Sequence, residues 1–183
     1  MARVNFGTKT FLYPMPVLIV STYDENGVPD AMNAAWGCIT DFDEISISMS
    51  SHKTTDNIAK TGAFTVSIAT EDTVIPCDYV GIVSANDVPD KFARAGFHAT
   101  KSEFVNAPLI DELPMALECK FRSFDNGIMI GEIVNVNADE SILTDGKIDP
   151  AKLKPIAFDP VNSTYTALGP VVGKAFSDGL KLK

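Results

Sequence analysis

The chain has 183 residues, of which 45% are hydrophobic and 21% are charged, and this composition predicts a single compact domain over residues 1–183. Its 24 acidic residues outnumber its 15 basic residues, and the net charge of −9 argues against binding to nucleic acids or anionic membranes. The N-terminal segment lacks the apolar run of a signal peptide, and the apolar stretch at 15–20 is too short to cross a bilayer. We therefore expect neither a nucleic-acid nor a membrane partner.

Cysteine and histidine usage indicates a reducing compartment and no metal site. Cys38, Cys77 and Cys119 are odd in number and include no CxxC pair, which favours reduced, buried thiols in a cytoplasmic protein. His52 and His98 lie far apart without a neighbouring ligand pattern, so we predict no zinc or iron site.

The first half of the chain shows the period-two alternation of β-strands. Residues 17–23 and 29–36 predict the two strands of a hairpin, with the turn residues Asp24–Gly27 between them. Residues 44–49 predict a strand with isoleucine and methionine on one face and serine on the other, and residues 63–69 repeat the pattern. These segments indicate an antiparallel sheet.

The second half contains the clearest hairpin of the sequence. Residues 115–124 and 128–137 both alternate between apolar and polar side chains, and Asn126-Gly127 lies in the connection. Because Asn and Gly both tolerate positive φ, this pair is typical of a tight hairpin turn.

Helices are predicted to be few and short. Residues 54–61 predict one helix, with Thr54 or Thr55 as the N-cap and a glycine after its end. Residues 73–83 and 89–96 predict two more, each limited by a proline near its start, and residues 141–155 read mostly as loop. Many short strands with few helices predict a mainly β fold, a closed or partly closed barrel capped by small helices.

Two segments could bind a ligand, although the usual catalytic motifs (GxGxxG, GxxxxGK[ST], GxSxG and HExxH) are absent. The first, residues 50–57, lies between a strand and a helix, where the first-turn N–H groups and a lysine suit a phosphate. The alternative is a solvated N-cap cluster. The residues concerned are Ser50, Ser51, His52, Lys53, Thr54 and Thr55.

The second segment, residues 31–37, ends a strand with small residues beside the only tryptophan. Small side chains let a flat ligand reach the backbone, and the Asn33 amide can read a heteroaromatic edge. The alternative is a buried strand with Trp36 as core filler. Because no pair of side chains is marked as acid and base, a cofactor is expected to perform the difficult chemistry.

The order and spacing of several segments resemble the flavin reductase-like family, most closely its flavoredoxin branch. The likeness extends from about residue 10 to 180. The segments that carry it are Pro16–Thr22, Asn33–Trp36, Ser51–Ile58, Thr61–Ser67, Gly81–Ser84, Asp90–Gly96, and the tail with Tyr165, Leu168-Gly169 and Val172–Phe176.

The resemblance implies an FMN-binding split β-barrel, usually a homodimer with the flavin near the subunit interface. It places the isoalloxazine ring along Asn33, Ala34, Ala35 and Trp36. It assigns the ribityl phosphate to Ser50, Ser51, Lys53, Thr54 and Thr55, with Lys91 as a further flavin contact. His52 either donates to the phosphate or only forms part of the turn.

One departure from the family pattern concerns anion binding. Relatives often place Gly-Arg where this chain has Ala85-Asn86, which weakens the case for an anion contact there, to a nicotinamide dinucleotide or to a partner. We expect a flavin-dependent oxidoreductase of the NAD(P)H:flavin reductase type, with a reduced pyridine nucleotide or a redox protein as its partner. The alternatives are an electron carrier without NAD(P)H activity of its own and a non-redox barrel for another small molecule. No catalytic side chain is predicted, because flavin N5 accepts the hydride or electrons.

Overall fold

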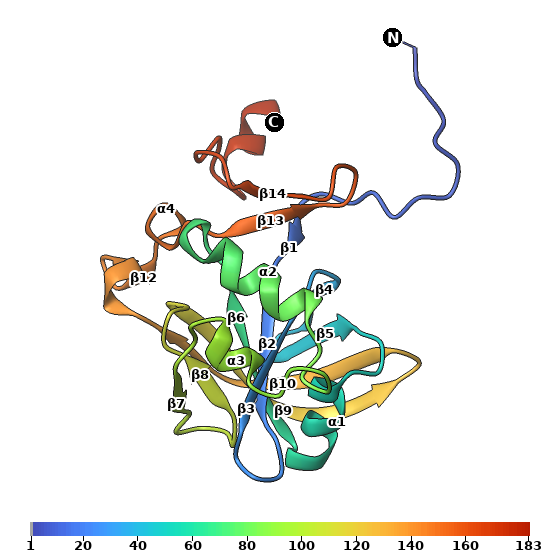
Figure 1. Ribbon diagram of the computed structural model, residues 1–183. Coiled ribbons are helices and arrows are strands. Elements are labelled where there is room, and N and C mark those ends of the chain that lie inside the picture. The colour runs from blue at the N-terminus through green and yellow to red at the C-terminus, as the bar shows by residue number, and fades with distance from the viewer. Residues whose placement is uncertain (1) are drawn as a thin grey trace.

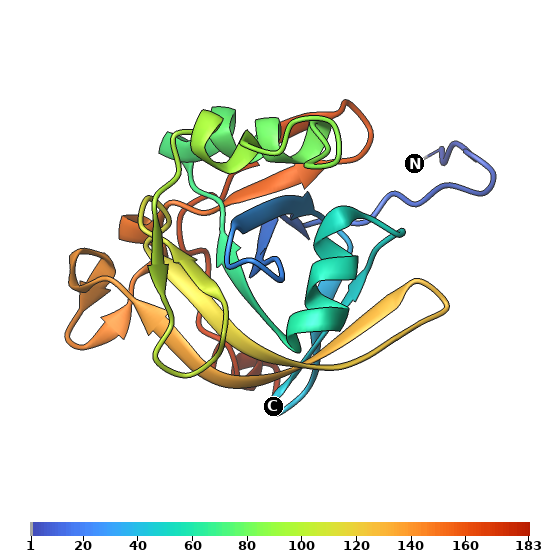
Figure 2. The same cartoon turned by 60° about the horizontal axis from the view of Figure 1, so that its bottom comes forward.

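A computed structural model describes residues 2–183 and shows a fold built mainly of antiparallel strands (Figure 1). The central sheet has seven strands in the order β3-β2-β6-β9-β10-β5-β4. Figure 2 shows it strongly curled, with the long β9–β10 hairpin passing beneath helix α1 (Lys53–Thr61). The strands of this sheet are β2 (Leu18–Tyr23), β3 (Pro29–Ala34), β4 (Gly37–Asp41), β5 (Glu44–Ser48), β6 (Ala63–Ile68), β9 (Met115–Asp125) and β10 (Ile128–Ala138).

Smaller elements surround the central sheet. One small sheet has the order β1-β13-β14, and two pairs, β7-β8 and β11-β12, complete the strands. Their bounds are β1 (Met15–Pro16), β7 (Ala99–Lys101), β8 (Pro108–Ile110), β11 (Leu143–Thr144), β12 (Lys147–Ile148), β13 (Ile156–Asp159) and β14 (Thr164–Ala167). The helices are α1 (Lys53–Thr61), α2 (Val74–Ile82), α3 (Lys91–Arg94) and α4 (Pro150–Leu153), with 3-10 turns η1 (Glu71–Thr73), η2 (Glu140–Ile142) and η3 (Asp178–Leu182).

The predicted β9–β10 hairpin is confirmed. Asp125 pairs with Ile128, so the connection has two residues, and both Asn126 (φ 50°) and Gly127 (φ 77°) have positive φ. This is the conformation of a type I′ turn, whose twist matches that of the flanking strands.

The β2–β3 hairpin is also confirmed, but its second strand ends at Ala34 rather than at residue 36. The Asp24 carboxylate accepts hydrogen bonds from the N–H groups of Asn26 and Val28, both at 2.8 Å. The side chain therefore reinforces a turn that the backbone also closes, through bonds from the Asp24 N–H to the Val28 carbonyl (2.8 Å) and from the Gly27 N–H to the Asp24 carbonyl (3.1 Å).

Strand β2 separates two hydrophobic cores. Leu18 and Val20 face the interior of the curled sheet together with Ile58 of α1, whereas Ile19 faces an outer core that contains Val80 of α2. Both faces of the strand are buried, which explains why its first three residues, Leu18–Val20, are all apolar. As a result α1 and α2 pack against the same β2–β3 hairpin, and a cleft lies where they approach strand β3.

The predicted helices exist, with corrected boundaries. Helix α1 begins at Lys53 and its N-cap is His52, not Thr54 or Thr55, because the Thr55 hydroxyl already accepts the His52 N–H. It ends as predicted at Gly62 (φ 74°), whose N–H donates to the Ile58 carbonyl. Helix α3 is a single turn, and the segment 141–155 is not mostly loop, since it holds the β11–β12 hairpin and α4.

The cysteine prediction needs one correction. All three thiols are free, and Cys77 and Cys119 are buried, but Cys38 is exposed because it lies on β4, the edge strand of the sheet. Within residues 2–183, no helix is long and apolar enough to span a membrane.

Candidate functional site

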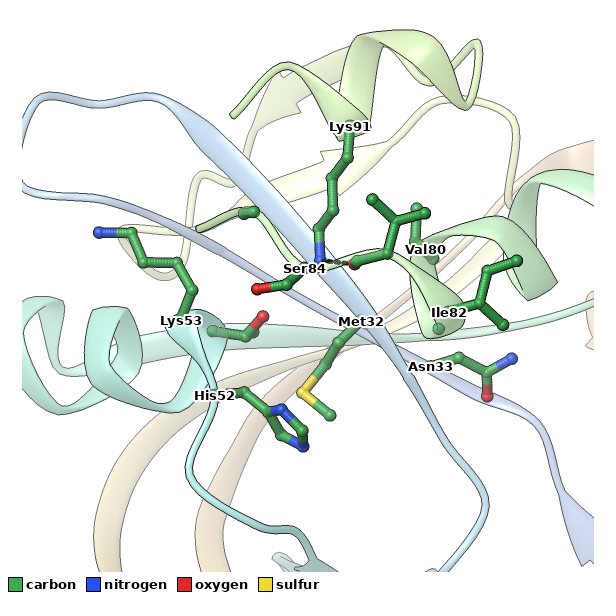
Figure 3. Close-up of a pocket in the computed structure, with 12 residues that line it drawn as sticks. Met32, Asn33, His52, Lys53, Val80, Ile82, Ser84 and Lys91 are labelled. Carbon is green, nitrogen blue, oxygen red and sulfur yellow. Dashed lines mark hydrogen bonds between the residues drawn. The ribbon is translucent and has the colours of Figure 1, made fainter. Parts of the chain in front are cut away.

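The candidate site is a cleft between strand β3, the start of α1 and the end of α2 (Figure 3). It consists of two adjoining cavities of about 620 Å³ and about 250 Å³, which share Met32, Asn33 and His52 as lining residues. Figure 3 shows Lys53 at one end and Asn33 at the other, with Met32 and His52 between them. The larger cavity is also lined by Ala34, Ala35, Trp36, Ser48, Met49, Ser50 and Gly127, and the smaller by Lys53, Thr54, the stretch Val80–Ala85, and Lys91.

This cleft brings together the two segments that sequence reasoning singled out separately. All of the predicted site residues line it except Ser51 and Thr55. Ser51 is exposed on the turn before α1, whereas Thr55 is buried behind its first turn.

The floor of the larger cavity is formed where β3 ends. Ala34 is buried and Ala35 half-buried, so little side-chain bulk covers the backbone there. Trp36 is 54% exposed and therefore does not serve as core filler, which was the alternative interpretation of this segment. A flat apolar ligand could contact this surface directly.

The first turn of α1 places positive charge at one end of the cleft. The N–H groups of Lys53 and Thr54 find no acceptor within residues 2–183, as expected for the first helical positions. The helix dipole adds partial positive charge at the same place, and the Lys53 ammonium adds a full charge. Ser50 and His52 are linked by a 2.9 Å hydrogen bond between Oγ and Nε2 and remain exposed.

The hydroxyls of the two threonines in this turn, which were expected to contact a phosphate, form hydrogen bonds within the protein instead. The Thr54 hydroxyl donates to Asp30 Oδ2 at 2.6 Å, and the Thr55 hydroxyl bonds both the N–H and the carbonyl of His52 at 2.8 Å. Both hydroxyls hold the turn in place, so for a ligand only the Thr54 N–H remains. The hydroxyl donors left in the cleft for a phosphate are then those of Ser48 and Ser50, before the helix, and of Ser84, just after α2.

Lys91 reaches the cleft from α3 and is 3% exposed. Its ammonium lies 3.2 Å from Asp30 Oδ1 and donates to the Val83 carbonyl at 3.2 Å, the bond that is dashed in Figure 3. The contact with Asp30 is an ion pair without the alignment of a hydrogen bond, since Oδ1 has no aligned donor. Because Asp30 neutralises Lys91, the charge of this lysine is less available to an anion than its position alone would indicate.

Lys53 has a weaker restraint on its charge. It is half-buried, and it contributes to lowering the pKa of Asp24, for which the main cause is the hydrogen bond from the Val28 N–H. Among the cations lining the cleft in residues 2–183, Lys53 is the one without a buried carboxylate partner. It is the strongest candidate for an anion contact.

Asn33 is held by residues whose role at the site sequence reasoning missed. Its amide nitrogen donates to the Cys77 carbonyl at 3.1 Å and to the Tyr165 hydroxyl at 3.5 Å. Tyr165 in turn donates to Asp78 Oδ1 at 2.7 Å, and burial together with this bond raises the pKa of Tyr165 to about 12. Tyr165 lies 132 positions from Asn33 in the chain, so no local signal could have paired them.

The ligand types that commonly hold metal ions are scattered over the described part of the chain. Residues 2–183 contain no group of three His, Cys, Asp or Glu side chains placed to hold a metal ion. The polar side chains that line the cleft carry amide, hydroxyl, imidazole and ammonium groups.

Comparison with known proteins gives the cleft its context. The family described as flavin reductase like domain matches residues 10–153. The structure of flavoredoxin of Desulfovibrio vulgaris (Miyazaki F) is 39% identical over 97% of this chain and 100% of that chain, with a TM-score of 0.93. Flavoredoxin from Methanosarcina acetivorans is 26% identical over 100% of both chains, with a TM-score of 0.89.

More distant structures share the fold alone. An FMN-binding domain of a flavin reductases-like enzyme from Shewanella baltica OS155 is 21% identical over 87% of this chain and 88% of that chain, with a TM-score of 0.78. No curated protein sequence matches the chain. The curled seven-stranded sheet and these likenesses confirm the predicted fold class, a mainly β split barrel.

Proposed function

Since the chain belongs to the flavin reductase-like family, in its flavoredoxin branch, we propose that it binds FMN in this cleft and passes electrons through the bound flavin. The observation that carries the proposal is the continuity of the cleft, which joins a flat, lightly covered surface to a cationic helix start. A flat ring with a phosphorylated side chain has the same two parts.

The residues present fit such a group. The larger cavity, about 620 Å³, falls within the roughly 300–1,000 Å³ of typical ligand sites. Asn33, Ala34, Ala35 and Trp36 would hold the ring, and the two unpaired first-turn N–H groups with Lys53 and Ser50 would hold the phosphate. A bound flavin supplies the electron-accepting chemistry, while these residues bind it, orient it and limit the access of water.

The electron donor is either a reduced pyridine nucleotide or a redox protein. A pyridine dinucleotide brings a pyrophosphate, which favours additional cations. The stretch Ser84–Asn86, where relatives often carry an arginine, offers none, and Lys91 is already paired with Asp30. These observations and the 39% identity to a flavoredoxin favour a redox protein as the donor, and NAD(P)H-dependent flavin reduction is the second candidate.

An absorbance spectrum of the purified protein, followed by titration with NADH and NADPH under anaerobic conditions, tests this function. We expect flavin bands and, for a carrier, no bleaching by either nucleotide without a partner. Rapid bleaching would instead support the reductase. A colourless protein that binds no added flavin would overturn the proposal in favour of a non-redox barrel.

We further propose that the working unit is a homodimer in the cytoplasm. The edge strand β4 and its flanks expose Trp36, Ile39 and Phe42, and an unpaired strand edge with apolar side chains is commonly covered by a partner. Because Trp36 also lines the larger cavity, a partner seated here would border the flavin.

A further inference from the structure

We infer that the side chain of Asn33 is locked as a hydrogen-bond acceptor and recognises the N3–H of the flavin ring, with Tyr165 and Asp78 as positioning residues. The inference rests on the proposed flavin binding and adds to it which partner donates the hydrogen bond and which accepts it. It concerns β3, α2 and β14, three elements far apart in the sequence.

Both hydrogens of the Asn33 amide are already used. A carboxamide has two N–H donors and one carbonyl acceptor. The Cys77 carbonyl can only accept, so the atom beside it at 3.1 Å must be the nitrogen. The second hydrogen is directed to the Tyr165 hydroxyl at 3.5 Å.

The Tyr165 hydroxyl is able to accept because its own proton is committed elsewhere. It donates to Asp78 Oδ1 at 2.7 Å, a short bond to a carboxylate that fixes the direction of the hydroxyl. Asn33 therefore donates to Tyr165 and Tyr165 donates to Asp78, so each group in the chain has a compatible partner. Flipping the Asn33 amide would place its oxygen against the Cys77 carbonyl oxygen and break this order.

Helix α2 also fixes the position of the side chain. A Cβ atom on Gly81 would come within 2.9 Å of the Asn33 Cβ, so this glycine is what allows β3 and α2 to approach so closely. Figure 3 shows the amide nitrogen of Asn33 directed away from His52, at the end of the cleft opposite Lys53. Within residues 2–183, no donor reaches Oδ1, which leaves it free for a ligand.

An acceptor that cannot rotate selects a donor on the ligand. The oxidised isoalloxazine edge carries acceptors at N1, O2, O4 and N5 and one N–H, at N3. An acceptor facing any of the others would leave two lone pairs opposed and desolvated, which is costly. N3–H is therefore the ring position that Asn33 can pair with.

The test compares the affinities of the full-length protein for FMN and for 3-methyl-FMN, measured by flavin fluorescence. A hydrogen bond of typical net strength predicts that wild-type protein prefers FMN by about five- to tenfold. Asn33→Ala should abolish this preference, and Tyr165→Phe should reduce it about two- to threefold by releasing one amide hydrogen. Tyr23→Phe, at a half-buried tyrosine that lines a different cavity, is the matched control and should keep the wild-type ratio.

The ratio of affinities separates a positioning role from a general loss of structure, because misfolding lowers both affinities together. If the wild type binds FMN without this preference, or if Asn33→Ala retains it, the inference is overturned while flavin binding stands. If the wild type binds neither flavin, the proposed function itself fails.

Discussion

Replacing Lys53 by alanine separates cofactor binding from folding at the start of α1. Lys53 is the first helical residue, where the helix dipole makes a positive charge mildly unfavourable. Its removal should therefore change the free energy of unfolding of the apo protein by no more than about 0.5 kcal/mol. With FMN bound, the charge would instead meet a phosphate.

The structure leaves Lys53 with a larger part of the phosphate-binding free energy than the sequence alone indicates. The hydroxyls of Thr54 and Thr55 are bonded inside the protein, and Lys91 is neutralised by Asp30. A charge-assisted contact contributes about 1.5–3 kcal/mol to binding. Because Lys53 is only half-buried, solvent screens part of its charge, and we expect Lys53→Ala to weaken the free energy of FMN binding by about 1–3 kcal/mol. Riboflavin, which has no phosphate, should bind the variant and the wild type alike.

Fluorescence titrations with both flavins, at low and high salt, measure these effects, and urea unfolding of the apo forms measures stability. Lys60→Ala is the matched control, because Lys60 lies in the last turn of the same helix and pairs with Glu25 at 3.1 Å. It should leave FMN affinity unchanged, and the salt dependence should become shallower only in Lys53→Ala. An equal loss of riboflavin binding in Lys53→Ala would refute the assignment of Lys53 to the phosphate.

Three further predictions concern packing, thiols and assembly. Gly131→Ala should destabilise the protein by about 1–3 kcal/mol in urea unfolding, because the new methyl group overlaps the buried Phe64 ring; an unchanged midpoint would contradict this packing. Burial raises the pKa of Cys77 to about 11 and of Cys119 to about 12, so no more than one thiol per native chain should react with a thiol reagent at neutral pH. Reaction of two or three thiols before unfolding would show that this core is open. Light scattering at micromolar concentration should give the mass of a dimer, and the interface between its subunits should bury roughly 2,000 Å² or more. A monomer that still holds flavin would rule the dimer out.

Local chemistry made part of the fold predictable. Asn126-Gly127 specifies a two-residue turn by its tolerance of positive φ, and the residues on either side alternate, so the β9–β10 hairpin follows from a few neighbouring residues. Strand β4 was missed for the opposite reason. Four of its five residues are exposed, so it has no buried face that periodicity could reveal.

The candidate site likewise has a part that local sequence predicts and a part that depends on tertiary packing. The helix start at Lys53 and the small residues around Ala35 are recognisable because their chemistry is contiguous in the sequence. The pairing of Asp30 with Lys91 depends on how β3 and α3 pack. Nothing in either local segment indicates it, because an aspartate after a turn also fits a solvated position.

The contacts of the tail depend on tertiary structure to a still greater degree. Tyr165 lies beyond the residues that the family matches, and it meets Asp78 across 87 positions of the chain. Figure 1 shows β13 and β14 beside α2, an arrangement that only the folded chain creates. The tail was recognised from its residues, but its part in orienting Asn33 was not.

Parallel titration of the apo protein with FMN and with riboflavin tests most directly whether the cleft binds a phosphorylated flavin. We predict saturable binding of one FMN per chain, with an affinity at least about tenfold higher than that for riboflavin, since the phosphate contacts at the start of α1 are worth roughly 1.5–3 kcal/mol each. Equal affinities for the two flavins would contradict the assignment of the phosphate to α1, and the absence of binding to either would contradict flavin binding altogether.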